Sequence, residues 1–330
     1  MKRFLLALAS AALVCLPAFS VAEAAPQSIK IVCPMGSRDF NNVLLRDVFK
    51  PDVEKNSNGK YQVDIFTDSS MGGVQEIFQG VTFGTVHFAQ AGGGLSTYMP
   101  EMGVLDMPFL ANSWENAVTF CATDGFAFVD KALQKKGMKL MLLYPNGFRE
   151  FQSTRPIPSY ASLKGLKCRT SQSKYHVAMA EAFGMVGTSI VGSEGTAALQ
   201  QGVVQVIDGD LLSALAFGVL AVSPNIYASK HQMMPGLIYC NKKWFDSLSA
   251  EDQKLFQGAF AEFNKAFLEG YGAVYDEVLA RIVPEFHGTI TQPTDAERRQ
   301  MAEDAAKAYD SLPADLKKIA LEFHEKYGAR

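Results

Sequence analysis

Cysteines are few in this sequence and lie far apart. It contains five, of which Cys15 lies near the N-terminus and the others are Cys33, Cys121, Cys168 and Cys240. No C-x-x-C pair occurs, which argues against a zinc site. Although an exported chain can form disulfides, a chain of this size needs no covalent cross-links, so we expect buried free thiols.

Long apolar runs are also scarce. The main one, residues 4–19, follows Lys2 and Arg3 and precedes the small residues of an A-x-A cleavage site. This pattern predicts a signal peptide over residues 1–24, cleaved near Ala24–Ala25. No other run reaches the roughly 20 apolar residues that span a bilayer. We therefore expect an exported protein without stable membrane insertion.

Charge of one sign is not in excess. The formal net charge is -3, and removing Lys2, Arg3 and Glu23 changes it to -4. Such a mild charge argues against nucleic acid as a partner. The remaining chain of about 300 residues suggests two domains, and 48% hydrophobic residues supply ample core.

Catalytic motifs are missing. The histidines are scattered and form no H-E-x-x-H motif or recognisable triad, and no G-x-S-x-G elbow, Walker loop or dinucleotide fingerprint occurs. We therefore assign no catalytic residue, no metal ligand and no cofactor. An enzyme has no positive evidence in this sequence.

The chain does contain short strands that alternate with helices. Strands are expected at residues 28–34, 61–66, 86–91, 139–144 and 166–170, and helices at 39–54, 73–80 and from 113 to about 133. This alternation predicts an α/β architecture with open sheets. No low-complexity or proline-rich linker occurs, so strands should join the domains.

One segment predicts an unusually long helix. Between residues 250 and 285 the apolar residues recur at steps of three and four, with Ser249 at the start and Pro284 at the end. At about 1.5 Å per residue this helix is roughly 50 Å long. It would therefore cross two domains, because a domain of about 150 residues has a radius of gyration near 15 Å. A capping box at Thr294 should start a final helix.

Two arginines follow neighbouring strands. The stretch "SLKGLKCRTSQS", residues 162–173, places Arg169 at a strand end before a helix, and Arg149 comes just after Gly147 beyond the preceding strand. Ligands of open α/β sheets bind at the carboxyl ends of strands. Two guanidiniums there suit a carboxylate. Alternatively, one or both arginines are surface residues paired with acids.

The run "NGFREFQSTRPIPSYASLKGLKCRTSQS" resembles the signature of the DctP-type solute-binding subunits of tripartite ATP-independent periplasmic (TRAP) transporters. That signature has G-x-R and then D-L-K-G-L-K-x-R-x-P. "SNGKYQVDIF", "LDMPFL" and "SLSAEDQKLFQGA" add to the likeness, which covers nearly the whole mature chain. It implies a two-domain periplasmic binding protein fold with a central ligand cleft and a long helix spanning both domains. It also implies capture of an organic acid, without chemistry, for delivery to a TRAP membrane permease.

The resemblance also implies roles for particular residues. Arg169 matches the arginine that binds the substrate carboxylate, Arg149 matches a second arginine of the cleft, and Gln172 matches a polar position just beyond. Without gaps, the family's ligand-binding asparagine falls on Gly209 and Asp208 takes the neighbouring acid position, whereas a shift by one residue brings in Asp210 instead. An acid there would meet a ligand amine or hydroxyl, or would instead cap the following helix.

Other positions depart from the sialic-acid-binding members. Gln90 replaces a glutamate, Gly92 to Gly94 replaces bulkier residues, and Gly192 stands where an aromatic residue is frequent. Phe148 lies beside Arg149. The missing side chains leave volume for a ligand. We infer an organic acid that is larger or flatter than a small dicarboxylate, with aromatic acids included.

The predicted domain division has chain crossings near Pro145 and Pro235. Residues 25–146 and 235–275 would form domain I, and residues 147–234 and 276–330 domain II, closing on the ligand like a hinge. We expect a monomer in the periplasm. Two other functions stay open at this point: an exported enzyme acting on a carboxylated substrate, and a ligand-sensing subunit for a membrane receptor.

Overall fold

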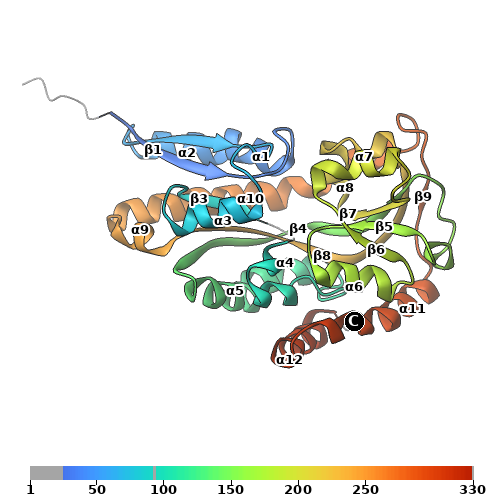
Figure 1. The fold of residues 1–330 in the computed structure, drawn as a ribbon. Helices are drawn as coiled ribbons and strands as arrows, with labels where there is room; N and C mark the ends of the chain where they lie inside the picture. The colour runs from blue at the N-terminus through green and yellow to red at the C-terminus, as the bar shows by residue number, and fades with distance from the viewer. Residues whose placement is uncertain (1–24, 92–93, 329–330) are drawn as a thin grey trace, which may run out of the picture.

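The computed structural model describes residues 25–91 and 94–328 (Figure 1). The predicted signal peptide, residues 1–24, and the candidate Gly92 lie outside the described residues. Within the described part of the chain, no helix has the length and apolar character needed to cross a membrane.

The strands form one hydrogen-bonded sheet in the order β2-β1-β3-β8-β4-β7-β5-β6, with β9 paired to β8. The strands are β1 Gln27–Val32, β2 Tyr61–Phe66, β3 Phe88–Ala91, β4 Met138–Ser153, β5 Lys167–Thr170, β6 Val186–Ser189, β7 Val206–Gly209, β8 Asn225–Asn241 and β9 Ile290–Thr291. We expected separate open sheets, but the hydrogen bonding is continuous because the long antiparallel strands β4 and β8 pair along most of their length. The strands β1 to β3 lie at one end of this pair and β5 to β7 at the other (Figure 1).

Strand β4 extends well beyond the predicted residues 139–144. It continues through Pro145, which pairs with Pro235 of β8. The two residues that lack a backbone N–H thus share one register instead of interrupting the ladder at two places. The register shifts just after this pair, where Gly147 adopts a φ of 101°. The shift is a bulge at the middle of the molecule.

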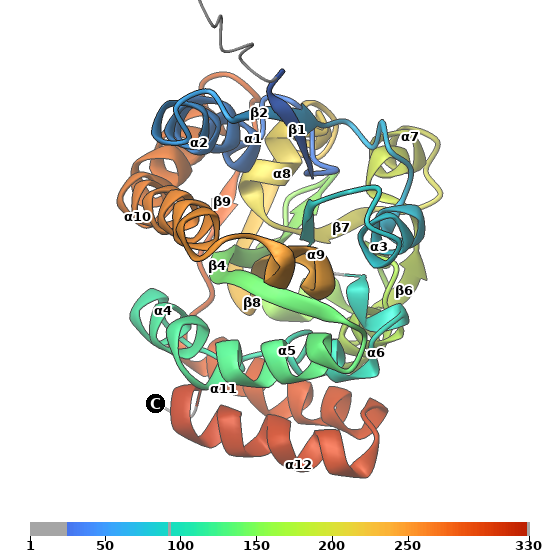
Figure 2. The ribbon, with the colours of Figure 1, turned by 90° about the vertical axis from the view of Figure 1, so that its left-hand side faces the viewer.

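Helices cover both faces of the sheet (Figure 2). They are α1 Phe40–Leu44, α2 Lys50–Asn56, α3 Val74–Thr82, α4 Trp114–Ala122, α5 Asp124–Gln134, α6 Lys174–Ala182, α7 Gly195–Gln200, α8 Leu211–Ala216, α9 Lys242–Ser247, α10 Ala250–Arg281, α11 Asp295–Ala305 and α12 Ala314–Phe323. The single helix predicted from residue 113 to about 133 is two helices. They separate at Thr123, beside Gly125, where a Cβ would lie 2.7 Å from the Phe120 ring.

Helix α10 joins the two ends of the molecule, as predicted. It has 32 residues and begins after Ser249, whose side chain accepts a hydrogen bond from the Asp252 N–H. Its first half packs phenylalanines, among them Phe260, into the core with β1 and β3. Val278 of its last turn and Ile282 just after its end pack into a separate core with α7, α8 and β8. The helix therefore crosses from one core to the other (Figure 1).

The C-terminal segment also contacts both ends. Helix α11 begins at the predicted capping box of Thr294 and Glu297 and packs Met301 into a core with β5 and α6. Helix α12 packs Leu316 and Ala320 against the layer of α4 and α5 instead (Figure 2). The predicted domain division remains a prediction, with α12 lying on elements of domain I in that division.

Candidate functional site

A cavity of about 480 Å³ opens between the two ends of the sheet, and we call it the cleft. One wall comes from α3 and from the segment after β3. The other comes from β5, α8 and the turn before α7. Six of the predicted site residues line it: Gln90, Arg149, Arg169, Gln172, Gly192 and Asp210.

Arg169 presents an unneutralised charge to the cleft. It is on β5, where Cys168 and Thr170 are buried and Arg169 is partly exposed, so strand alternation turns its side chain the other way. Its Nε donates to the Ile190 carbonyl at 2.9 Å, and no carboxylate of the described residues forms an ion pair with it. Burial, followed by repulsion from Arg149, lowers the pKa of Arg169 to about 10. This charge would be stabilised by an anion.

Gly192 leaves the Arg169 guanidinium accessible. A Cβ at Gly192 would lie 3.6 Å from Arg169 Nη2 and 3.7 Å from the Phe217 ring. A side chain larger than alanine would therefore cover the guanidinium or displace Phe217. The backbone at Gly192 has no positive φ, so its conformation does not require glycine. The effect of glycine at this position is the space that it leaves beside Arg169.

Arg149 departs from the predicted position. It lies inside β4 rather than beyond a strand end, because β4 continues past Gly147. Its Nε donates to Asp208 Oδ1 at 2.8 Å and its Nη2 to the Asp208 carbonyl. Arg149 thus contacts the cleft while paired with a buried acid, so its charge is already balanced within the protein.

Asp208 is the centre of this buried network. It is fully buried, and Nε2 of His231 lies 3.2 Å from its Oδ1. Burial alone would raise the pKa of Asp208, but the Arg149 charge and the His231 hydrogen bond hold it well below its usual value. Asp208 does not line the cleft, because it lies behind Arg149.

Asp210 is at the start of α8 and lines the cleft. Its Oδ1 accepts a hydrogen bond from the Ser213 N–H at 2.8 Å, which caps the helix. Burial raises the pKa of Asp210. Of the two alternatives, ligand contact and helix capping, the geometry provides the cap, and a ligand contact stays a prediction.

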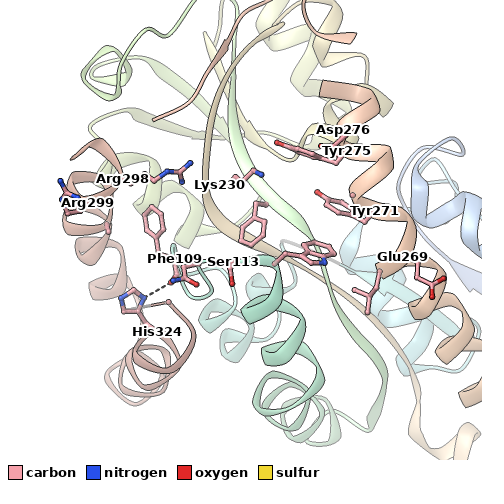
Figure 3. Close-up of a pocket in the computed structure, with 17 residues that line it drawn as sticks. Phe109, Ser113, Lys230, Glu269, Tyr271, Tyr275, Asp276, Arg298, Arg299 and His324 are labelled. Carbon is pink, nitrogen blue, oxygen red and sulfur yellow. Dashed lines mark hydrogen bonds between the residues drawn. The ribbon is translucent and has the colours of Figure 1, made fainter. Parts of the chain in front are cut away.

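Phe148 lies outside the cleft, because neighbouring residues of a strand face opposite sides of the sheet. It lines a second cavity of about 920 Å³, the back cavity, together with residues of α10 and α11 (Figure 3). This cavity mixes charges of both signs, from Lys230 and Arg298 and from Glu269 and Asp276. The cleft contains the isolated cation Arg169, so we take the cleft as the candidate site although the back cavity is larger.

The cleft also contains polar residues that sequence reasoning missed. Ser171 lines it and hydrogen-bonds to the buried His176, which approaches Asp106. The further polar members are Ser69, Gln75, Glu76, Thr97, Asn146, Gln152, Ser193 and Ser213. No motif in the sequence links these residues, since they meet only when distant segments fold together.

The comparisons with known proteins agree with this geometry. The family model for the bacterial extracellular solute-binding protein, family 7, matches residues 41–319. A solute-binding protein of Verminephrobacter eiseniae is 31% identical over 253 residues, which cover 74% of this chain and 75% of the relative. The 2,3-diketo-L-gulonate-binding periplasmic protein YiaO of Escherichia coli is 28% identical, over 72% of this chain and 73% of its own.

Solved structures share the fold. A TRAP periplasmic solute-binding protein from Haemophilus influenzae, with bound L-gulonate, matches with a TM-score of 0.82 and 24% identity over 90% of this chain and 99% of that one. A second, from Desulfovibrio desulfuricans with bound sn-glycerol-3-phosphate, matches with a TM-score of 0.84 and 22% identity over 91% and 97%. The chain belongs to the DctP family, the bacterial extracellular solute-binding proteins of family 7 that serve TRAP transporters and bind small organic acids without being enzymes.

Proposed function

We propose that this protein captures a hydroxylated organic acid, of the sugar-acid class, in the cleft and delivers it to a TRAP permease. The single observation that carries this proposal is Arg169, a guanidinium at a strand end in a cavity without a carboxylate partner among the described residues. A ligand carboxylate would supply the missing charge with two parallel hydrogen bonds. Arg149 would add a second cation at the edge of the same site.

The lining of the cleft supports a polyhydroxylated ligand. Amide and hydroxyl groups of Gln90, Asn146, Gln152 and Ser193 surround the space, and such groups bond to ligand hydroxyls. YiaO is named for a diketo sugar acid and one structural relative contains L-gulonate, which agrees with this class. A flat aromatic acid is the second candidate, favoured by Tyr98 and Phe217 in the lining.

The remaining parts of the proposal concern the whole protein. The family is periplasmic, and we propose that residues 1–24 direct export before cleavage near Ala25. We also keep as proposals the division into domains at Pro145 and Pro235 and a monomeric state.

The test is a thermal-shift screen of the purified mature chain against aldonates, uronates, aromatic acids and dicarboxylates, with the corresponding neutral sugars as controls. A ligand that binds the folded state raises the melting temperature with concentration. Mass spectrometry of the recovered ligand then shows whether it returns unchanged. Stabilisation by neutral sugars but by no acid would refute the proposal, and turnover would refute a binding role.

A further inference from the structure

A buried row of polar side chains ends at the Ser171 hydroxyl, which faces the cleft. Ser171 Oγ hydrogen-bonds to Nδ1 of His176, and Nε2 of that ring lies 3.3 Å from Asp106 Oδ1. His176 and Asp106 are almost fully buried, whereas Ser171 lines the cleft. A ligand can therefore contact Ser171 but not the two residues behind it.

The Asp106 carboxylate is the charged group at the buried end of this row. Its Oδ2 accepts hydrogen bonds from Ser96 Oγ at 2.6 Å and from Ser173 Oγ at 2.9 Å. Burial alone would raise the pKa of Asp106, but the His176 ring and the two hydroxyls lower it below its ordinary value. Its second oxygen, Oδ1, faces the imidazole.

The charge on Asp106 decides where the protons of its neighbours lie. Nε2 of His176 makes no hydrogen bond of regular geometry, but the negative oxygen 3.3 Å away favours placing the ring hydrogen on Nε2. With the hydrogen there, Nδ1 is an acceptor. Ser171 must then donate its only hydrogen to Nδ1. The Ser171 oxygen then has only lone pairs facing the cleft. It can accept a hydrogen bond from a ligand hydroxyl but cannot donate one to a carboxylate.

Ser171 follows Arg169 by two residues, and both line the cleft. In extended chain, residues two apart are separated by about 7 Å. A carboxylate on Arg169 would therefore bring the first carbons after it toward Ser171. The family signature given above has proline at this position, which has no hydroxyl, so the acceptor is a feature of this chain.

We propose that Ser171, oriented by His176 and Asp106, selects acids with a hydroxyl on the second or third carbon by accepting a hydrogen bond from it. This inference rests on the proposed function and names a determinant of its substrate class. Ser171 touches the ligand, and His176 is a positioning residue that acts through it.

The test compares matched acids by calorimetry on the mature protein. The probes are D-gluconate, D-galactonate and L-gulonate, each with its 2-deoxy and 3-deoxy form, and hexanoate and benzoate as acids without hydroxyls. Losing one neutral hydrogen bond lowers affinity about three- to tenfold. We expect one deoxy form of a bound acid to bind the wild type weaker by this factor.

Substitutions at Ser171 test whether this residue causes the preference for the hydroxylated acid. Ser171→Ala should bind the parent acid and the deoxy form within twofold of each other, while Ser171→Thr, which keeps a hydroxyl, should retain the preference. Ser247→Ala is the control, because Ser247 is exposed and lies outside the cleft lining, so the substitution removes a serine hydroxyl without touching the site. It should retain the preference, and circular dichroism checks that every variant is folded.

The outcomes separate this inference from the proposed function. Tight binding of hexanoate or benzoate with no hydroxyl preference would overturn the inference and leave an organic-acid receptor. A preference that survives in Ser171→Ala would also overturn it. If none of these acids binds and only neutral sugars do, the proposed function fails and the inference fails with it.

Discussion

Arg169 provides the positive charge of the cleft that has no carboxylate partner among the described residues. Arg149 is balanced by Asp208, whereas Arg169 has only a carbonyl acceptor among the described residues. Replacing Arg169 by alanine should weaken binding of an acid ligand by about 2–5 kcal/mol, the usual cost of removing one member of a desolvated charge pair. That corresponds to roughly 30-fold to several thousand-fold in calorimetric Kd. Arg169→Lys should also bind clearly more weakly, because an ammonium cannot form the planar fork.

Arg155 offers the matched control for this substitution. It is exposed and lies outside the cleft lining, so Arg155→Ala removes the same charge without removing the contact. It should bind within twofold of wild type. A folded Arg169→Ala protein that binds within threefold of wild type would refute the carboxylate contact.

Glu150 makes stability depend on pH. It is fully buried, and only its Oε1 has a partner, the Tyr275 hydroxyl at 2.7 Å. Burial raises the pKa of Glu150 to about 7. The folded state therefore holds a proton that the unfolded state loses near its ordinary pKa, so stability falls as pH rises between these values, by about 3 kcal/mol in total.

Glu150→Gln tests this linkage, since an amide keeps an acceptor for Tyr275 and carries no charge. The variant should be more stable than wild type at pH 8, by up to about 3 kcal/mol, with the advantage fading toward pH 4. Urea unfolding at both pH values measures the difference. An advantage that is the same at pH 4 and pH 8 would contradict the assignment.

At the scale of the element, the bulge in β4 depends on Gly147. Its φ of 101° is costly for any other residue, and a Cβ there would overlap the Tyr271 hydroxyl of α10. The glycine thus allows the strand and the long helix to approach at the middle of the molecule. Gly147→Ala should destabilise the fold by about 2 kcal/mol or more in urea unfolding.

Gly258→Ala is the control with the opposite sign. Gly258 is in α10, and a Cβ added to it would have no neighbouring atom within 4 Å, so alanine should stabilise the helix by about 0.5–1 kcal/mol. Equal effects of the two substitutions would show that backbone conformation and the Tyr271 contact do not matter at Gly147.

At the scale of the whole molecule, the proposed function requires the two walls of the cleft to approach. Cysteines introduced at the exposed Phe83, after α3, and Val203, after α7, place spin labels on the two sides. The native thiols of the described residues are all buried, namely Cys33, Cys121, Cys168 and Cys240. Burial raises the pKa of each, so labelling should be confined to the new sites.

Adding an acid that binds the protein should shorten the distance between these two labels in pulsed spin-resonance measurements, as hinge closure predicts. A second pair, Phe83→Cys with Lys135→Cys, lies within the predicted domain I and should show no change. The domain division would be wrong if both pairs moved together or if the first pair did not move while calorimetry shows binding.

The sequence by itself determined the features that depend on local patterns. The recurrence of apolar residues predicts α10 without any knowledge of its neighbours, and the alternation around Cys168 predicts β5 with Arg169 near its end. Hydrophobic periodicity and capping act within a few residues, so they can be read from the chain directly.

Only the tertiary structure decided which polar groups meet. Arg149 and Asp208 are 59 residues apart, and Ser173 is 67 residues from Asp106, so neither contact has a local pattern. The structure balances the charge of Arg149 through a strand pairing, β4 with β7, and leaves Arg169 without such a partner. A side chain's availability to a ligand depends on what the fold places beside it, and a linear sequence does not specify that.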